Sequence, residues 1–587
     1  MRSPCAPLTV CYFGLLLLVA GCGQEAGDVA PSAEAPAGGA ANDELATRST
    51  PAEAEAAGLE LRYAAPAADI EESVLEGEPG TAVARQKHAP AASSSIPAED
   101  QEHSRPQSEA EDFSTETYDR IVENAFRTVI DHPLSTFSID VDTASYSNVR
   151  RYLNNGQLPP PGAVRIEELV NYFPYDYPAP NGDVPFAVNA EIAGCPWEPR
   201  HRLVRFGLKG QVIDADQRPP SNLVFLLDVS GSMQSESKLP LVKQAMQLLV
   251  ERLDENDTVS IAVYAGSSGL VLPPTPASRK HVILSAMERL RAGGSTNGGQ
   301  GIELAYSTAM SEFIEGGTNR VILCTDGDFN IGITNHSQLV RMIEEKAKSG
   351  VFLSVLGFGM GNYKDSTMEK LADHGNGNYA YIDTFAEARK VLVEQLTGTL
   401  VTIAKDVKIQ VEFNPAQVAA YRLVGYENRM LAKEDFNDDT KDAGEIGAGH
   451  TVTALYEIVP RGVESPALAS VDPLKYQQPA GLSTEAMSTE ILTLKLRYKE
   501  PDGQTSRKLE FPIRESDAPF ATASREFQFA SAVAAFGMLL RQSGHKGVAT
   551  YAAVEEWAAP AIAADTAGYR EEFLRLVRIA GGLAGSS

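Results

Sequence analysis

Short apolar runs alternate with helical patterns over residues 218–400, and this alternation constrains the possible fold more than any other feature. The run Leu223–Leu227 is apolar throughout, as expected for a strand buried on both faces. The helical segment LPLVKQAMQLLVERL follows it, and the apolar runs TVSIAVYA, NRVILCT and VFLSVLGFG each precede further helical patterns. Strands that alternate with helices of this length form a mostly parallel sheet with helices on both faces. We therefore predict an α/β, doubly wound sheet for this region.

Oxygen-bearing side chains come directly after two of these predicted strands. The first strand leads into a DxSxS sequence, the run NRVILCT leads into TDG, and a glycine-rich segment, GGSTNGG, lies between them. The candidate ligands are Asp228, Ser230, Ser232, Thr296 and Asp326. Because ligands of open α/β sheets bind outside the carboxyl ends of the strands, we expect these side chains to converge there. An all-oxygen set matches a hard divalent cation, with Mg²⁺ favoured and Mn²⁺ or Ca²⁺ compatible. The alternative is a loop in which the serines only cap the next helix.

The pattern DxSxS…T…D after an apolar strand resembles the metal-ion-dependent adhesion site of von Willebrand factor type A domains, which are Rossmann-like. Two further segments, FSIDVDTASYSNVRRYLNNGQLPPPGAVRIEELVNYFPY and YENRMLAKEDFNDDTKDAGEIGAGHTVTALYE, resemble the ends of a bacterial lipoprotein family often called YfbK-like. The resemblance extends from about residue 117 to residue 583, with no departure at the five metal positions. It implies direct coordination by the two serines, direct or water-mediated coordination by the threonine, and water-mediated coordination by the two aspartates.

A site of this kind predicts binding to an acidic partner. If the carboxylates act through water, the inner ligands are neutral and the cation keeps most of its charge. An open coordination position then attracts a carboxylate from another protein. The expected function is therefore protein binding, without a catalytic residue.

The first 22 residues are predicted to be a signal peptide. The apolar run YFGLLLLVA is too short to span a bilayer, and it ends in Val19-Ala20-Gly21-Cys22, which resembles a bacterial lipobox. Acylation of Cys22 would anchor the chain in the cell envelope. Gly23 in place of aspartate indicates the outer rather than the inner membrane in a Gram-negative cell. Residues 23–112 carry 19 acidic and 5 basic side chains and few apolar ones, which predicts a disordered acidic tether.

Two further regions flank the predicted sheet. Residues 113–209 form an N-terminal family-specific region of α+β character, with a helix expected at 118–126. Residues 404–583 begin with strand-like segments and end with three helical ones, which predicts a β-sheet plus helical domain. An acidic loop in this domain is a possible second cation site through Asp435, Asp438, Asp439, Asp442 and Glu445. It is not an EF-hand, because Thr440 replaces the required glycine and Ile446 replaces the terminal glutamate. A solvated loop is the simpler interpretation.

Charge and motifs narrow the class of function. A net charge of −27 argues against nucleic acid as the main partner. The chain has no GxSxG, P-loop or HExxH motif, so we predict that it is not an enzyme. The favoured hypothesis is a lipid-anchored module that captures an acidic group of a protein through its cation. The alternatives are a scaffold that works with an AAA-type ATPase, or a metal-dependent hydrolase.

Overall fold

The computed structural model describes residues 116, 118–182, 184–214, 217–295, 298–327, 336–360, 364–466, 468, 481–501 and 503–585. The predicted signal peptide and acidic tether, and Thr296 of the candidate site, lie outside these residues. No helix within the described ranges has both the length and the apolar character needed to cross a membrane.

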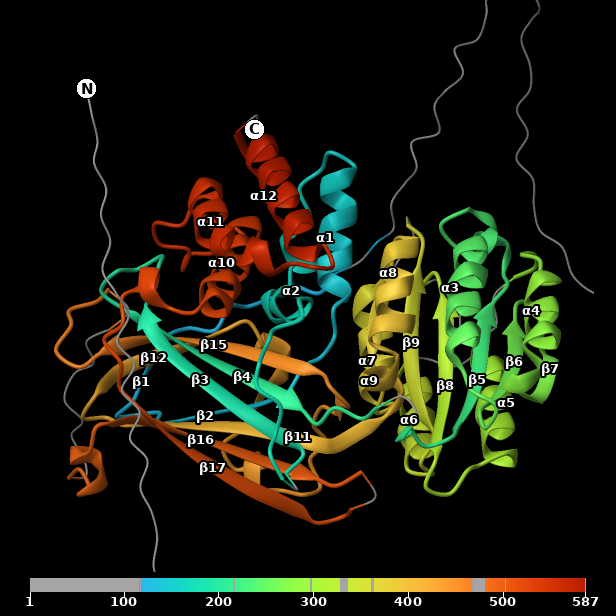
Figure 1. Cartoon of the computed structure of the whole chain (residues 1–587), viewed down its shortest axis with the longest axis horizontal. Helices are drawn as coiled ribbons and strands as arrows, with labels where there is room; N and C mark the ends of the chain where they lie inside the picture. Colours follow the sequence, from blue (N-terminus) through green and yellow to red (C-terminus); the bar gives the residue numbers. More distant parts are fainter. Residues whose placement is uncertain are drawn as a thin grey trace, which may run out of the picture. The chain divides into compact units, whose positions relative to one another are not determined.

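A six-stranded sheet occupies the centre of the sequence (Figure 1). Its spatial order is β10 (Tyr379–Ile382), β9 (Phe352–Phe358), β8 (Thr318–Thr325), β5 (Ser221–Asp228), β6 (Thr258–Tyr264) and β7 (Ser268–Pro276). All neighbouring strands are parallel except β7, which pairs antiparallel with β6 at one edge. The sheet predicted from the alternating pattern is confirmed.

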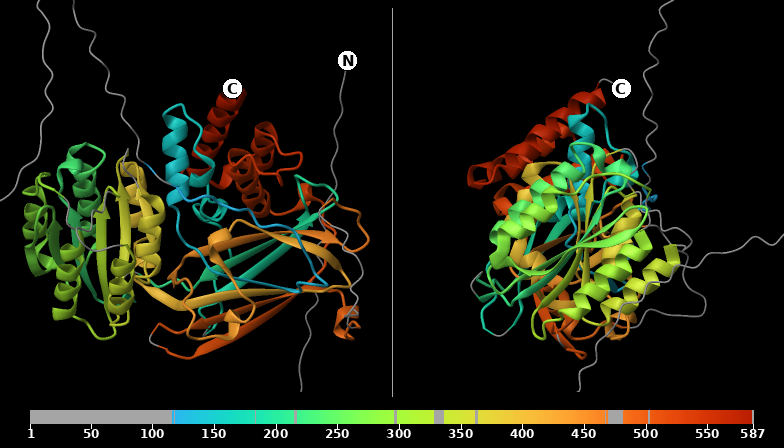
Figure 2. Two further views of the ribbon diagram at one scale, coloured as in Figure 1. Left: turned by 180° about the vertical axis from the view of Figure 1, so that it is seen from behind. Right: turned by 90° about the vertical axis from the view of Figure 1, so that its right-hand side faces the viewer.

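Helices cover both faces of this sheet (Figures 1 and 2). One face is covered by apolar side chains of α3 (Leu239–Arg252), α4 (Lys280–Glu288) and α8 (Phe385–Arg389). The other face is covered by those of α5 (Gly298–Ser311), α6 (His336–Ala347) and α7 (Asp365–Asp373). β5 contributes alternate residues to the two cores, with Phe225 in one and Leu226 in the other. This two-sided burial explains the uninterrupted apolar run in the sequence.

The regions before and after this domain share two further sheets. One has the order β1 (Arg127–Thr128), β12 (Val418–Val424), β15 (Thr451–Pro460), β4 (Arg202–Gly210) and β3 (Phe186–Gly194). The other has the order β13 (Met430–Leu431), β2 (Leu134–Ser138), β11 (Thr402–Phe413), β16 (Glu490–Lys499) and β17 (Ser506–Arg514), with β14 (Ile446–Gly447) paired to β11. Both sheets contribute to one hydrophobic cluster, where Tyr456 contacts Phe413 and Phe137. The two sheets therefore pack face to face.

The regions predicted at residues 113–209 and 404–583 are therefore not structurally separate from each other. Strands from both regions hydrogen-bond to each other, and the central α/β domain is inserted between them in sequence. The helices are shared as well: α1 (Ala144–Asn154) and α2 (Ile166–Asn171) pack with α10 (Arg525–Leu540), α11 (Tyr551–Ala558) and α12 (Tyr569–Gly585) (Figure 2). Short-range patterns do not reveal such long-range pairing.

The helix expected at residues 118–126 is also absent, since this segment has no regular secondary structure. It leads directly into β1, which pairs with β12. The Asn124 side chain donates hydrogen bonds to the carbonyls of Leu423, at 3.2 Å, and Gly425, at 2.8 Å. These contacts to a distant strand hold the segment in a non-helical conformation.

Candidate functional site

The candidate ligands lie at the carboxyl edge of the central sheet. β5 ends at Asp228, and the neighbouring strand β8 ends at Thr325, one residue before Asp326. Because β5 and β8 are parallel and paired, their carboxyl ends meet at the same edge. The structure thus brings together four of the five predicted residues, Asp228, Ser230, Ser232 and Asp326.

Hydrogen bonds fix the carboxylate of Asp228 in position. Its Oδ1 accepts the backbone N–H of Ser230 at 2.8 Å. Its Oδ2 accepts the hydroxyls of Tyr264, at 3.1 Å, and of Thr325, at 3.3 Å. Asp228 is fully buried, and burial raises its pKa to about 6, while the hydrogen bonds from Ser230 and Tyr264 act in the opposite direction. The carboxylate therefore lies behind the loop and is not exposed to solvent.

The two serines present hydroxyl groups in front of this carboxylate. The Oγ atoms of Ser230 and Ser232 lie 3.0 Å apart, and the Ser230 residue is buried whereas Ser232 is exposed. Gly231 donates its backbone N–H to the carbonyl of Gly294, at 3.0 Å. Gly294 has a φ of 88°, a left-handed conformation that suits glycine. The glycine-rich segment before Thr296 is thus hydrogen-bonded to the serine loop.

Asp326 has a partner that the sequence analysis missed. Its Oδ2 accepts a hydrogen bond from Nζ of Lys238 at 2.8 Å, and both side chains are buried. The aliphatic part of Lys238 passes close to Gly359, where a Cβ atom would lie 2.3 Å from the lysine Cε. A larger residue at position 359 would therefore displace this lysine.

A sequence signal for Lys238 existed. It immediately precedes α3, and the amino end of a helix disfavours a positive charge because of the helix dipole. A buried cation at this position needs a nearby anion, which Asp326 supplies. Tyr264 and Thr325 were also missed, although each is the last residue of a strand beside Asp228.

The donor set fits a hard divalent cation. Two buried carboxylates and two hydroxyls meet at one edge, and hard cations prefer such oxygen ligands. Within the described part of the chain, no group of three or more His, Cys, Asp or Glu side chains is placed to hold a metal. A cation at this edge would therefore depend on hydroxyl groups as well as carboxylates.

The acidic loop of the C-terminal region does not form a second cluster. Asp435 and Asp438 accept hydrogen bonds within their own turns, and Asp439 accepts from Arg497 and Ser506. The other two predicted members are Asp442 and Glu445, and no three of these five acids are grouped to hold a metal within the described residues. Turn formation and an ion pair engage three of these carboxylates, and a cation site in this loop stays a prediction.

An open parallel sheet with a DxSxS loop at its carboxyl edge defines a von Willebrand factor type A domain protein. The family model of that domain matches residues 222–395. A model described as "Uncharacterized protein YfbK, C-terminal" matches residues 398–583, and one described as "von Willebrand factor" matches residues 112–205.

Relatives assign the chain to a particular family. It is 45% identical over 478 residues to protein YfbK of Escherichia coli (strain K12), covering 80% of this chain and 82% of that protein. The chain belongs to the YfbK family. Protein sll0103 of Synechocystis is 30% identical over 196 residues, which covers 33% of this chain and 45% of that protein. A von Willebrand factor type A structure from Catenulispora acidiphila is 15% identical, covers 67% of this chain and 89% of its own, and has a TM-score of 0.39.

This assignment supports a role in protein interaction or adhesion. Domains of the von Willebrand factor A type commonly bind a divalent cation. The family relationship points to an interaction module rather than to a catalyst.

Proposed function

We propose that this protein is an exported, lipid-anchored binding module that captures an acidic group of a protein partner through a divalent cation. The observation that carries the proposal is the layered site at the carboxyl edge of the sheet. Buried carboxylates of Asp228 and Asp326 lie behind the hydroxyl groups of Ser230 and Ser232. Mg²⁺ is the favoured cation, and Mn²⁺ and Ca²⁺ suit the same oxygen ligands.

The residues have distinct roles in this proposal. Ser230, Ser232 and Thr296 would hold the cation through their hydroxyls, and Asp228 and Asp326 would hold it mainly through water. The bound cation supplies a positive charge toward solvent, where the exposed Ser232 lies. A partner carboxylate would complete the coordination, so affinity for the partner requires both the metal and the hydroxyl groups.

Lys238 also affects the net charge at the proposed cation site. Its ammonium group already neutralises Asp326, so a divalent cation must bind beside a fixed positive charge. This arrangement favours weak binding of the cation alone and stronger binding when a partner adds negative charge.

Capture of a partner from detergent-solubilised membranes tests the proposal. We expect the full-length chain to retain a specific protein in Mg²⁺, and to lose it in EDTA or when Thr296→Ala removes one predicted ligand. Ser295→Ala, which removes the neighbouring exposed hydroxyl, is the matched control and should retain the partner. Equal recovery with and without EDTA would contradict the proposal.

The proposed anchor is the acylated Cys22, followed by the acidic tether of residues 23–112. We propose that it attaches the module to the outer membrane.

We expect Cys22→Ser to move the protein from the membrane pellet to the soluble fraction, as measured by immunoblotting after fractionation. Cys195→Ser is the control, because that thiol is buried in the folded chain. An unchanged membrane fraction for Cys22→Ser would exclude lipid anchoring through this residue.

A further inference from the structure

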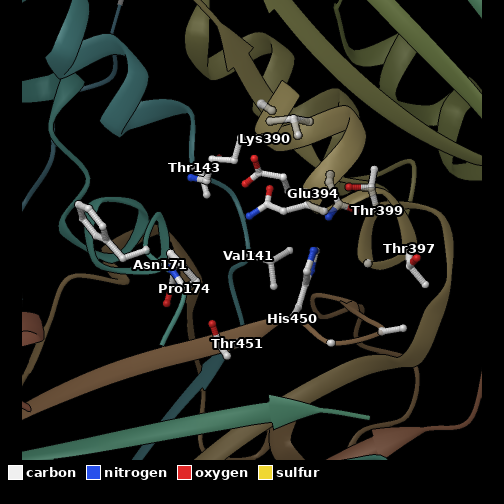
Figure 3. A pocket seen from close by; sticks show the side chains of 18 of the residues that line it. Val141, Thr143, Asn171, Pro174, Lys390, Glu394, Thr397, Thr399, His450 and Thr451 are labelled. Carbon is white, nitrogen blue, oxygen red and sulfur yellow. The ribbon is translucent and has the colours of Figure 1, made fainter. Parts of the chain in front are cut away.

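A cavity of about 410 Å³ lies where the central domain meets the flanking sheets (Figure 3). Several segments line it. Val141, Thr143, Asn171 and Pro174 come from the N-terminal region, Lys390, Glu394, Thr397 and Thr399 follow β10, and His450 and Thr451 lie at the start of β15. Further lining residues come from β9 and from the end of β4. This volume is typical of sites for small molecules, which often lie between domains. None of the four predicted metal ligands that the structure describes lines it.

Several polar groups that line the cavity lack protein partners. The Nδ1 atom of His450 is buried and has no hydrogen-bond partner among the described residues, and its ring points into the cavity (Figure 3). The hydroxyls of Thr397, Thr399 and Thr451 likewise make no hydrogen bond to the described part of the chain. Buried polar groups are normally paired, so the Nδ1 of His450 is suited to a bound ligand, and the three half-buried threonine hydroxyls can contact the same ligand.

The His450 ring is held in place by its surroundings. A Cβ atom at Gly398 would lie 2.4 Å from two atoms of the ring, so the glycine permits this close approach. Burial lowers the pKa of His450 to about 4, and the nearby Lys209 acts in the same direction. The imidazole is therefore neutral at physiological pH, and it can donate or accept one hydrogen bond.

Two lysines that line the cavity can donate hydrogen bonds to an anion. Lys390 is buried and donates one hydrogen bond, to the carbonyl of Tyr172 at 2.7 Å. Lys209 donates to the carbonyl of Gly449 at 2.8 Å. An ammonium group has three donors, so each lysine keeps donors for a ligand. Glu394, the one acidic side chain among the described lining residues, accepts a hydrogen bond from Tyr569 at 2.6 Å.

Apolar side chains complete the wall, among them Val141, Phe173, Val212, Ile213 and Leu356. A ligand that satisfies the whole cavity must combine an anionic group with an apolar part. We propose that this cavity binds a small organic anion with an apolar body, such as a medium-chain carboxylate. The carboxylate would contact the lysine and imidazole donors, and the apolar part would lie against the aliphatic side chains.

Octanoate is a suitable probe, with 1-octanol as its neutral counterpart and inorganic phosphate as an anion without an apolar part. We expect isothermal titration calorimetry with the full-length chain to detect octanoate below its micellar concentration and neither of the other two. Lys209→Met and Lys390→Met should each weaken octanoate binding by about 10-fold, because each removes a charge-assisted hydrogen bond.

Lys243→Met is the matched control, because Lys243 also donates to backbone carbonyls, at 3.2 and 2.8 Å, but does not line the cavity. Lys209 is only half-buried, so Lys209→Met keeps the test valid if Lys390→Met fails to fold. If 1-octanol bound as tightly as octanoate, the cavity would not be an anion site. If phosphate bound as tightly as octanoate, the ligand would not need an apolar part. An equal loss in all three lysine variants would show a nonspecific charge effect and overturn the proposal.

Proton uptake gives a second measurement. Burial lowers the pKa of Lys390 to about 7, and an anion nearby should raise it again. At about pH 8 we therefore expect octanoate binding to take up protons, measured as a dependence of the calorimetric heat on the buffer. The groups that already face Lys390 are Glu387, Arg150, Glu394, Glu572, Tyr172 and Tyr569. Uptake should be lost in Lys390→Met and kept in Lys243→Met, and unchanged uptake in Lys390→Met would exclude this lysine from the site.

Discussion

Asp228→Asn should weaken Mg²⁺ and Mn²⁺ binding by about 10- to 100-fold, the usual effect of removing an outer carboxylate from a metal site. The amide is nearly isosteric and still offers an oxygen to the N–H of Ser230, which lies 2.8 Å from Oδ1. Burial already raises the pKa of Asp228 to about 6, so a neutral group is tolerated at this position. Folding should therefore survive while the affinity for the ion falls. Titration of the chelator-treated chain with Mn²⁺, followed by electron paramagnetic resonance, measures the affinity.

Two further variants distinguish a cation site from a general effect on the loop. Lys238→Met should strengthen ion binding by about 10-fold, because removal of a nearby positive charge removes about 1 kcal/mol or more of repulsion. Ser235→Ala, whose exposed hydroxyl lies 3.3 Å from that of Ser237, should leave the affinity unchanged. If Asp228→Asn and Lys238→Met both bind Mn²⁺ like the wild type, the cation does not bind at this edge of the sheet.

The central domain could be predicted because its signals are local. The apolar run of β5 and the amphipathic pattern of α3 each arise from neighbouring residues. The candidate metal ligands after β5 and β8 could be predicted for a related reason. A parallel sheet places the carboxyl ends of these two strands together. The position of Thr296, which lies outside the described residues, remains a prediction.

What could not be predicted depends on contacts between distant segments. The pairing of β2 with β11 joins residues more than 260 positions apart, and no periodic pattern records it. The partner of Asp326 is a lysine 88 positions away; its place before α3 indicates that it needs an anion, but not which one. The cavity lined by Lys390 and His450 likewise exists only after several distant segments have packed.

Such long-range contacts converge on Arg429, which follows β12 in the C-terminal region. Its guanidinium group lies 3.3 Å from Asp140 and 3.2 Å from Asp142, just after β2. It also lies 2.8 Å from Asp373 and 3.8 Å from Glu369, both on α7 of the central domain. One cation thus balances carboxylates from two other segments. Burial raises the pKa of Asp142 well above its usual value, with Asp140 adding to the effect, and burial also raises the pKa of Glu369.

Arg429→Met should lower the free energy of unfolding by about 3–5 kcal/mol, because it leaves buried carboxylates without their counter-ion. A carboxyl group whose pKa is higher in the folded than in the unfolded chain contributes its full stability below the unfolded-state pKa of about 4. This contribution is lost as the pH rises through the pKa of the folded state. The loss of unfolding free energy in Arg429→Met should therefore be larger at about pH 8 than at about pH 5, as measured by urea denaturation. Arg578→Met is the control: its side chain is 62% exposed and pairs with Glu555 at 2.8 Å, and such surface pairs contribute less than about 1 kcal/mol. The loss of unfolding free energy in Arg429→Met could instead match this control, or be the same at both pH values. Either result would show that the arginine does not hold the central domain against the flanking sheets by neutralising these acids.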